Sequence, residues 1–252
     1  MSLSRWQGKV ALVTGASSGI GEAIARRLGE IGMRVAVAAR RAERLERLAQ
    51  AIREAGAQAM AVSADLRVEA GIAALFAKVR EAWGGVDVLI NNAGLGREST
   101  LADGDPKDWK EMLDVNVFAA SLCIREALAD MEGKVDAQIV NISSLAGHRV
   151  PLGRNSTYYA ATKHALKALT DGLRFELVQR KSPIKLGMIS PGLVETGFHE
   201  TFYRDADKAR EGYSHFQVLQ PADIAEAVCY LLSTPPHVQV HDVILRAVGQ
   251  QH

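Results

Sequence analysis

The sequence predicts an α/β protein built on a doubly wound, parallel sheet. Short apolar, β-rich segments alternate with helical patterns along the whole chain, beginning at 9–14 and 34–39, continuing at 86–90 and ending at 240–246. Strands that alternate with helices form parallel sheets with helices on both faces. The chain has 252 residues without internal repeats or low-complexity linkers, so we expect one domain spanning 1–252.

Charge and cysteine content narrow the class of partner. Lys and Arg number 30 against 29 Asp and Glu, and this balance gives no electrostatic reason to expect nucleic acid or an anionic membrane as a partner. No run of about 18 apolar residues occurs, and the first residues lack the apolar region of a signal peptide. Cys123 and Cys229 fall in apolar helical patterns, which predicts buried free thiols. We therefore expect a cytoplasmic protein that acts on a small molecule.

A glycine-rich turn follows the first predicted strand and opens a helix. In such a strand–turn–helix unit, the first glycine permits the tight turn, the second lets the backbone approach a pyrophosphate, and the third lets helix and strand pack closely. A merely tight connection would also need glycines, but the position in the first βαβ unit favours dinucleotide binding. The candidate residues are Gly15, Ser17, Ser18, Gly19, Ile20 and Gly21.

The end of the second predicted strand indicates which dinucleotide binds. NAD-binding units carry an acidic residue about 20 positions after the glycines, where it binds the ribose 2′-hydroxyl. Ala39 holds that place here and Arg40 and Arg41 follow. Arginine pairs well with a phosphate and no carboxylate repels one, so NADP(H) is favoured over NAD(H). Alternatively, both arginines only begin the basic helix that follows.

Two later strand ends carry further binding candidates. Asp65 and Leu66 follow the strand 58–63, where the carboxylate either accepts from the adenine amino group or caps the next helix. Asn92 and Gly94 follow the apolar strand 86–90, where they either let the backbone approach a ligand or pin neighbouring strand ends. Both pairs would lie at the carboxyl edge of the sheet.

The middle of the chain supplies a polar residue in an apolar helix, and the last third supplies a long connection. Asn116 lies within a long predicted helix, 106–131. It either bonds to backbone, a contact that can bend a helix, or belongs to a site. The segment of about 192–219 lacks strong periodicity, is rich in aromatic and charged residues, and follows a strand. A long loop in that place is typical of a lid or substrate wall.

The chemistry is predicted around the stretch 143–163. Tyr159 and Lys163 are four residues apart, so on a helix both side chains leave the same face. Lowering a tyrosine pKa from about 10 to about 7 requires roughly 4 kcal/mol of phenolate stabilisation, which a lysine, a helix N-terminus and a cofactor cation would supply together. A serine from the preceding strand end would hold the substrate oxygen. Taken alone, the Tyr–Lys spacing is more typical of a solvated surface pair, and its force depends on the surrounding motifs.

Taken together, these motifs resemble the short-chain dehydrogenase/reductase family over essentially the whole chain. The residues that carry the resemblance are Thr14-Gly15-x-x-x-Gly19-Ile20-Gly21, Asp65, Asn91-Asn92-Ala93-Gly94, Asn116, Ser144, Tyr159-x-x-x-Lys163 and Pro191-Gly192. The resemblance implies a three-layer Rossmann-type fold with a mostly parallel, seven-stranded sheet. It also implies hydride transfer between a nicotinamide and a carbonyl or alcohol carbon.

The resemblance assigns a role to each matched residue. Tyr159 would be the general acid and base, Lys163 would lower its pKa and hold the nicotinamide ribose, and Ser144, preferred to Ser143 by its spacing to Gly147, would orient the substrate oxygen. Asn116 would hold a water behind Lys163. Residues of the segment after the sixth strand would contact the nicotinamide: Pro191, Gly192, Val194 and Thr196.

Two departures from the family pattern point to a subgroup. The spacing from Ser144 to Tyr159 is longer than usual, and the C-terminal strand lacks the frequent Val-Asp-Gly-Gly ending. Both are similar to NADP-dependent carbonyl reductases, a subgroup that includes 17β/3β-ketosteroid reductases, clavulanic aldehyde reductase and 3-hydroxy-acid dehydrogenases. His148 and Arg149 are candidates for binding a substrate carboxylate, or are ordinary solvated loop residues.

Two rival functions remain. A dinucleotide-sensing binding protein of this fold would have lost the Tyr or the Lys, and an epimerase or dehydratase acting on nucleotide sugars would need a larger C-terminal domain. The resemblance also implies a homodimer or homotetramer formed through the helices that carry Asn116 and Tyr159. The sequence does not identify the substrate.

Overall fold

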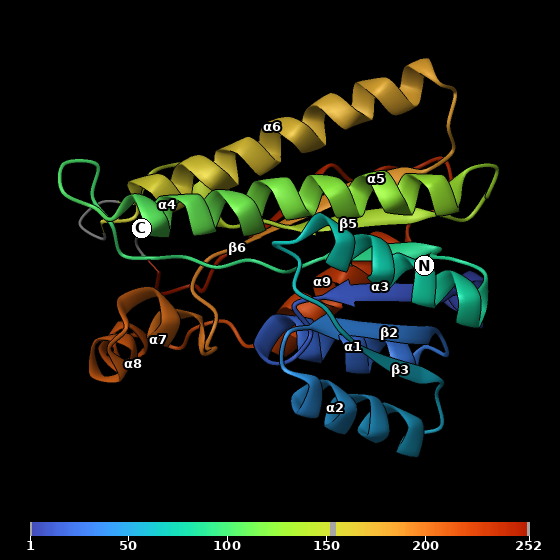
Figure 1. Ribbon diagram of the computed structural model, residues 1–252, viewed down its shortest axis with the longest axis horizontal. Helices are drawn as coiled ribbons and strands as arrows, with labels where there is room; N and C mark the ends of the chain where they lie inside the picture. Colours follow the sequence, from blue (N-terminus) through green and yellow to red (C-terminus); the bar gives the residue numbers. More distant parts are fainter. Residues whose placement is uncertain (1, 152–154, 251–252) are drawn as a thin grey trace.

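The computed structural model of the chain describes residues 2–151 and 155–250 and shows a twisted sheet between two layers of helices (Figure 1). The strand order is β3-β2-β1-β4-β5-β6-β7 and every pairing is parallel, so the predicted doubly wound, seven-stranded fold is confirmed. The strands are β1 (Val10–Thr14), β2 (Arg34–Ala39), β3 (Ala59–Ser63), β4 (Val88–Asn91), β5 (Gln138–Ile142), β6 (Lys185–Pro191) and β7 (Asp242–Leu245).

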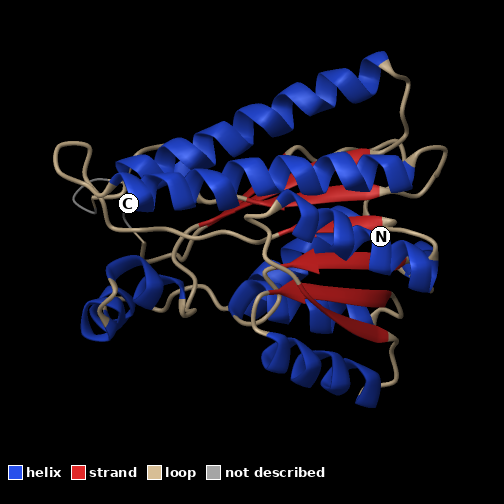
Figure 2. Ribbon diagram, viewed as in Figure 1, coloured by secondary structure: helices blue, strands red, loops and turns tan. Residues whose placement is uncertain are grey.

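Helices cover both faces of the sheet (Figure 2), and each face buries a separate apolar cluster. On one face pack α1 (Gly19–Glu30), α2 (Ala42–Glu54) and α9 (Pro221–Ser233). On the other pack α3 (Glu69–Trp83), α5 (Ala120–Met131) and α6 (Thr157–Gln179). The central strand β1 is buried along its whole length, as expected for a strand covered on both faces. Cys123 and Cys229 are both buried and free, as predicted.

The strand order reverses between β1 and β4, and this reversal positions the site. The chain runs outward from β1 to β3 and then returns to start the second half at β4 beside β1. Connections leave the two strands in opposite directions there, so a crevice opens at their carboxyl ends. The residues predicted to bind the cofactor, apart from Tyr159 and Lys163 on α6, lie at or just after strand ends at this edge.

The predicted long helix 106–131 contains a π-helical stretch. It consists of α4 (Pro106–Leu113), the π-helical η2 (Asp114–Ala119) and α5. The wider π turn carries Asn116, whose side chain bonds to the backbone of residue 95. Both parts of the backbone interpretation of Asn116 therefore hold, since it makes backbone bonds and the helix geometry changes around it.

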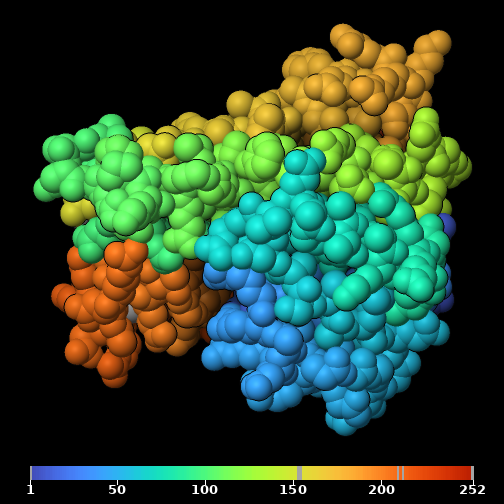
Figure 3. Space-filling view, viewed as in Figure 1, coloured from blue at the N-terminus to red at the C-terminus, as the bar shows by residue number. Residues whose placement is uncertain are grey.

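The segment 192–219 is not the plain loop that its weak periodicity predicted. It contains α7 (Phe198–Tyr203) and α8 (Ala206–Ser214), which lie away from the sheet beside a hollow in the molecular surface (Figures 1 and 3). The Asp205 carboxylate caps α8 by accepting from the amides of Asp207 and Lys208. These helices are too short for periodicity to show them, whereas the cap was visible in the sequence.

Two short helical turns complete the described chain, η1 (Ser4–Trp6) near its start and η3 (Leu145–Gly147) after β5. Among the residues that the structure describes, none of the helices combines the length and apolar character needed to cross a membrane.

Candidate active site

A cavity of about 540 Å³ opens at the carboxyl ends of the strands. Every residue predicted to bind the cofactor lines it, from the glycine turn to Pro191, Gly192, Val194 and Thr196. Ser144, Tyr159 and Lys163 line it as well, and Asn116 lies just behind the wall. Residues from both halves of the chain therefore surround one space, which extends along the sheet edge.

The glycine turn has the geometry expected of a phosphate-binding turn. Gly15 and Gly19 adopt φ of +67° and +60°, a region that other residues rarely enter. A Cβ on Gly15 would lie 2.8 Å from the Ala93 Cα, and one on Gly21 would lie 2.5 Å from the Asn92 Nδ2. Close packing of the turn against the end of β4 thus leaves no room for side chains.

Asn92 fastens this packing. Its Nδ2 donates to the Thr14 carbonyl at 2.8 Å, and its own amide donates to the Thr14 hydroxyl at 3.0 Å. The interpretation that Asn92 pins neighbouring strand ends is therefore correct, although the residue also lines the cavity. The side chain holds β1 and β4 in the arrangement that keeps the glycine turn open.

Positive charge gathers where the turn meets the end of β2. The Arg41 guanidinium donates to the Ser17 and Ser18 hydroxyls, each at 2.8 Å. Desolvation, followed by the charges of Arg44 and Arg40, lowers the pKa of Arg41. Arg40 and Arg41 both line the cavity, so an anion placed there would relieve their mutual repulsion.

Asp65 is already paired inside this region. Its carboxylate accepts from the Arg67 guanidinium at 2.6 Å and from the Arg67 amide at 3.0 Å, and these hydrogen bonds lower its pKa. It does not cap α3, whose N-cap is Val68. Leu66 is buried beside it at the cavity wall.

Tyr159 and Lys163 lie one turn apart on α6, as their spacing predicted. The Lys163 Nζ lies 5.8 Å from the centroid of the Tyr159 ring and donates to the Ile142 carbonyl at 3.1 Å. Burial raises the pKa of Tyr159 to about 12, partly offset by its hydrogen bond with Ser144, and burial lowers the pKa of Lys163 to about 8. The protein alone therefore does not lower the phenol pKa towards 7, because desolvation outweighs the nearby hydroxyl.

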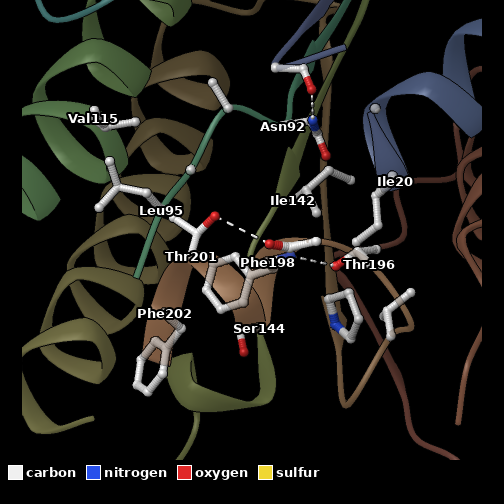
Figure 4. Close-up of a pocket in the computed structure, with 18 of the residues that line it drawn as sticks. Ile20, Asn92, Leu95, Val115, Ile142, Ser144, Thr196, Phe198, Thr201 and Phe202 are labelled. Atoms are coloured by element: carbon white, nitrogen blue, oxygen red, sulfur yellow. Dashed lines mark hydrogen bonds between the residues drawn. The ribbon is translucent and has the colours of Figure 1, made fainter. Parts of the chain in front are cut away.

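The two serines at the end of β5 differ in their surroundings. Ser144 faces the phenol, and its Oγ accepts from the Ala146 amide at 3.1 Å. Ser143 is buried, and its Oγ would lie 2.9 Å from a Cβ on Gly147. This arrangement supports the choice of Ser144, which lines the cavity and is labelled in Figure 4.

Asn116 joins the helix to the loop that follows β4. Its Oδ1 accepts from the Leu95 amide at 2.8 Å, and its Nδ2 donates to the Leu95 carbonyl at 2.7 Å and to the Thr162 hydroxyl at 3.0 Å. A Cβ on Gly94 would lie 3.4 Å from the Asn116 Oδ1 and 3.5 Å from the Lys163 Nζ. The amide and the ammonium therefore flank one glycine.

Comparison with known proteins accounts for this arrangement. The family model described as short chain dehydrogenase matches residues 9–207. The chain belongs to the short chain dehydrogenase family. It is 47% identical to the dehydrogenase/reductase SDR family member 11 of Bos taurus, over 98% of this chain and 99% of the relative. It is 42% identical to the farnesol dehydrogenase of Aedes aegypti, over 99% of this chain and 100% of the relative.

Solved structures agree with this assignment. The closed form of a serine dehydrogenase complexed with NADP+ superposes with a TM-score of 0.89 at 32% identity, covering 96% of each chain. A short chain dehydrogenase/reductase from Burkholderia phymatum in complex with NAD superposes with a TM-score of 0.85 at 27% identity, covering 95% of this chain and 89% of the other. The neighbours thus include complexes with each dinucleotide, and the family is one of nicotinamide-dependent oxidoreductases.

The end of the cavity beside Ser144 is lined by aromatic residues of the segment 192–219, which the sequence predicted as a lid or substrate wall, and by Leu95 and Val115, which it did not single out. Phe198 and Phe202 from α7 stack with ring centroids 6.1 Å apart, and the Tyr159 ring lies 5.5 Å from Phe198. Leu95 and Val115 complete an apolar wall around the end of the cavity that holds Ser144 (Figure 4). Phe198 and Phe202 are spaced i, i+4, a signal that the aromatic-rich segment already contained.

Of the two polar candidates for substrate contact, His148 and Arg149, only Arg149 lines the cavity. His148 points away from the cavity: its Nε2 lies 3.0 Å from the Ser190 Oγ and 2.9 Å from the Asp242 carboxylate. Arg149 does line the cavity. His199 bonds through its Nδ1 to the Tyr213 hydroxyl. Within the described ranges, 2–151 and 155–250, no group of three His, Cys, Asp or Glu is placed to hold a metal ion.

Proposed function

We propose that this dehydrogenase transfers hydride between NADP(H) and the carbonyl or alcohol carbon of a bulky, mainly apolar small molecule, acting as one catalytic domain. One observation carries the proposal: Ser144, Tyr159 and Lys163 meet at the apolar end of a cavity that also contains the glycine turn. A dinucleotide-sensing protein would not need this set, and the set is complete.

The residues present fit a dinucleotide phosphate. Gly15 and Gly21 pack closely against the end of β4, and Gly19 packs against Thr196, which lies 3.1 Å from the place of a Cβ on Gly19. The turn therefore presents backbone to the cavity that it lines. The amides at the start of α1 point to the same place, since helix N-termini bind anions. When bound, the nicotinamide would supply or accept the hydride.

The preference for NADP(H) rests on the arginines. No carboxylate stands at residue 39, and Arg40 and Arg41 both reach the cavity close to Ser17 and Ser18. Arg41 is also partly desolvated and surrounded by like charge, so a 2′-phosphate would gain a charge-assisted pair there. Asp65 and Leu66 would border the adenine.

The side chains would divide the work of proton transfer. A raised pKa of about 12 keeps the Tyr159 hydroxyl protonated at neutral pH, which suits a general acid that donates its proton to the carbonyl oxygen during reduction. The Ser144 Oγ would donate a hydrogen bond to the same oxygen. Lys163 would stabilise the phenolate that forms, and Asn116 would hold a water behind it.

The apolar wall favours one class among the candidate substrates. Phe198, Phe202, Leu95 and Val115 offer no charged partner to a carboxylate, so a ketone or aldehyde with a large apolar body fits best. Arg149, which follows η3, also lines the cavity, and a cation in this place makes a 3-hydroxy acid the second candidate. A panel of apolar ketones, aldehydes and 3-hydroxy acids, assayed with NADPH and NADH, separates the two.

The test of the mechanism uses neighbouring tyrosines. Tyr159→Phe removes the proposed acid, and loss of general acid catalysis lowers kcat by about 10²- to 10⁴-fold. Tyr158→Phe is the matched control, because Tyr158 stacks on Trp109 with centroids 5.2 Å apart and does not line the cavity. The mechanism is wrong if Tyr159→Phe retains wild-type turnover. A wild type that binds dinucleotide but turns over no substrate would favour the sensor.

We also propose that the protein forms a homodimer or homotetramer through α5, α6 and the adjoining η2. Large apolar side chains are exposed on these elements, among them Phe118 on η2 and, on α6, Phe175 at 72% and Val178 at 73% exposure. Exposed apolar surface of this kind favours association. Light scattering after size-exclusion chromatography should give a multiple of 27.2 kDa, and a monomer would overturn the proposal.

A further inference from the structure

The last described residues return to the cavity. After β7 the tail, residues 246–250, turns back so that the backbone N–H of Gln250 donates to the Ala247 carbonyl at 3.0 Å. Ala247 is buried and Val248 is fully exposed, whereas Gln250 is only 8% exposed and lines the cavity. The tail therefore places one polar side chain inside the site.

Gln250 holds the backbone that follows β6. Its Oε1 accepts from the buried Leu193 amide at 3.1 Å, and the preceding amide, that of Gly192, donates to the Leu245 carbonyl at 2.7 Å. The sheet ladder ends at Pro191, so the Leu193 N–H lies beyond the ordinary strand partners. The side-chain oxygen of Gln250 takes their place.

The surrounding packing is built around this contact. A Cβ on Gly192 would overlap the Gln250 Oε1 and would lie 3.2 Å from the Leu145 side chain. The glycine therefore makes room for the Gln250 side-chain amide beside η3. A Cβ on Gly249 would lie 2.7 Å from the Cβ of Phe216, which follows α8. The tail thus contacts both the backbone just after β6 and the far end of the segment 192–219.

We propose that Gln250 is a positioning residue that sets the conformation of the loop 191–196, the loop proposed above to contact the nicotinamide. The inference rests on the proposed function and extends it to the C-terminal tail. Without the Oε1 acceptor the buried Leu193 N–H loses its partner, and the loop leaves this conformation for part of the time. The apparent affinity for the dinucleotide then falls in proportion to the fraction of molecules whose loop keeps the binding conformation.

The test compares two side chains of similar length in the full chain. Gln250→Met removes the acceptor, and Gln250→Glu keeps an oxygen at the same place. The Kd for NADPH, measured by fluorescence titration, should rise about tenfold for Gln250→Met, as expected for an unsatisfied buried amide, and should change less than about threefold for Gln250→Glu. Val248→Ala, in the exposed part of the tail, should leave the Kd unchanged. Gln250→Met should also lower the Tm of the free protein modestly, because the buried Leu193 amide loses its acceptor. Gln250→Glu and Val248→Ala should keep the wild-type Tm.

Each remaining outcome is decisive. A Gln250→Met protein that binds NADPH as tightly as the wild type overturns the inference. Equal weakening by the Met and Glu variants, together with a lower Tm, shows a purely structural tail and also overturns it. A wild type that binds dinucleotide without turning over any carbonyl refutes the proposed function alone, since the Kd ratio is still measured. A wild type that binds neither NADPH nor NADH refutes both.

Discussion

Removing Arg41 should convert the dinucleotide preference. Its guanidinium bridges from the end of β2 to Ser17 and Ser18 on the glycine turn, with Arg40 beside it, so an NADP 2′-phosphate would complete a cluster that is otherwise only cationic. A hydrogen bond to a charged group contributes about 1.5–3 kcal/mol, which corresponds to roughly 10- to 150-fold in affinity. Arg41→Ala should therefore raise the KM for NADPH by that factor.

The same change should leave NADH nearly unaffected, because NADH has no 2′-phosphate. Steady-state kinetics with both dinucleotides measures the ratio directly, and its dependence on salt adds a second readout, since ion pairs at an exposed site weaken as salt rises. Arg47→Ala is the matched control: Arg47 is exposed on α2 and does not line the cavity. If neither Arg40→Ala nor Arg41→Ala changes the NADPH-to-NADH ratio, the reasoning about the 2′-phosphate is refuted.

Three further predictions follow from burial and packing. Gly96→Val should lower kcat/KM for bulky carbonyls by more than about tenfold without changing dinucleotide affinity, because a Cβ there would lie 2.7 Å from Phe202. Gly172→Ala is the control and should leave kcat/KM unchanged, because a Cβ there would meet nothing within 4 Å. Equal kcat/KM values for the two variants would disprove the substrate wall. Asn116→Ala should reduce the free energy of unfolding by about 1–3 kcal/mol in urea titrations, since the buried Leu95 amide loses its acceptor; unchanged stability would contradict this. Burial lowers the pKa of Lys163 from 10.5 to about 8, so at this residue the unfolded chain binds more protons between these values and the contribution of Lys163 to stability should rise as pH rises through 8 towards 10.5. Urea unfolding of the wild type and of Lys163→Met measures this contribution as a difference in slope against pH, and equal slopes would rule it out.

Several features of the site could be predicted because they depend on neighbours in sequence. The turn at Gly15 to Gly21 and the face shared by Tyr159 and Lys163 follow from local backbone geometry, which spacing records directly. The sequence predicted a lowered pKa for Tyr159, but without a bound cofactor the protein raises it. Burial opposes that ionisation, and burial depends on packing.

Other features stayed open in the sequence because their partners lie far along the chain. Asn116 bonds to Leu95, 21 residues away, and Gln250 bonds to Leu193, 57 residues away. His148 turned towards Ser190 and Asp242 instead of the cavity. Its direction depends on where β6 and β7, which carry these partners, lie relative to η3. No spacing rule connects such positions.

The amino-acid sequence by itself determined the alternation of strands and helices, the carboxyl edge at which the cofactor residues gather, and the tyrosine and lysine that share a helix face. These properties depend on interactions within a few residues, which periodicity, glycine and spacing express. Only the tertiary structure decided which side chains enclose the substrate end of the cavity, which carboxylates and amides were already paired, and that the tail reaches the loop after β6. Those contacts join distant segments, and their formation depends on how the layers pack.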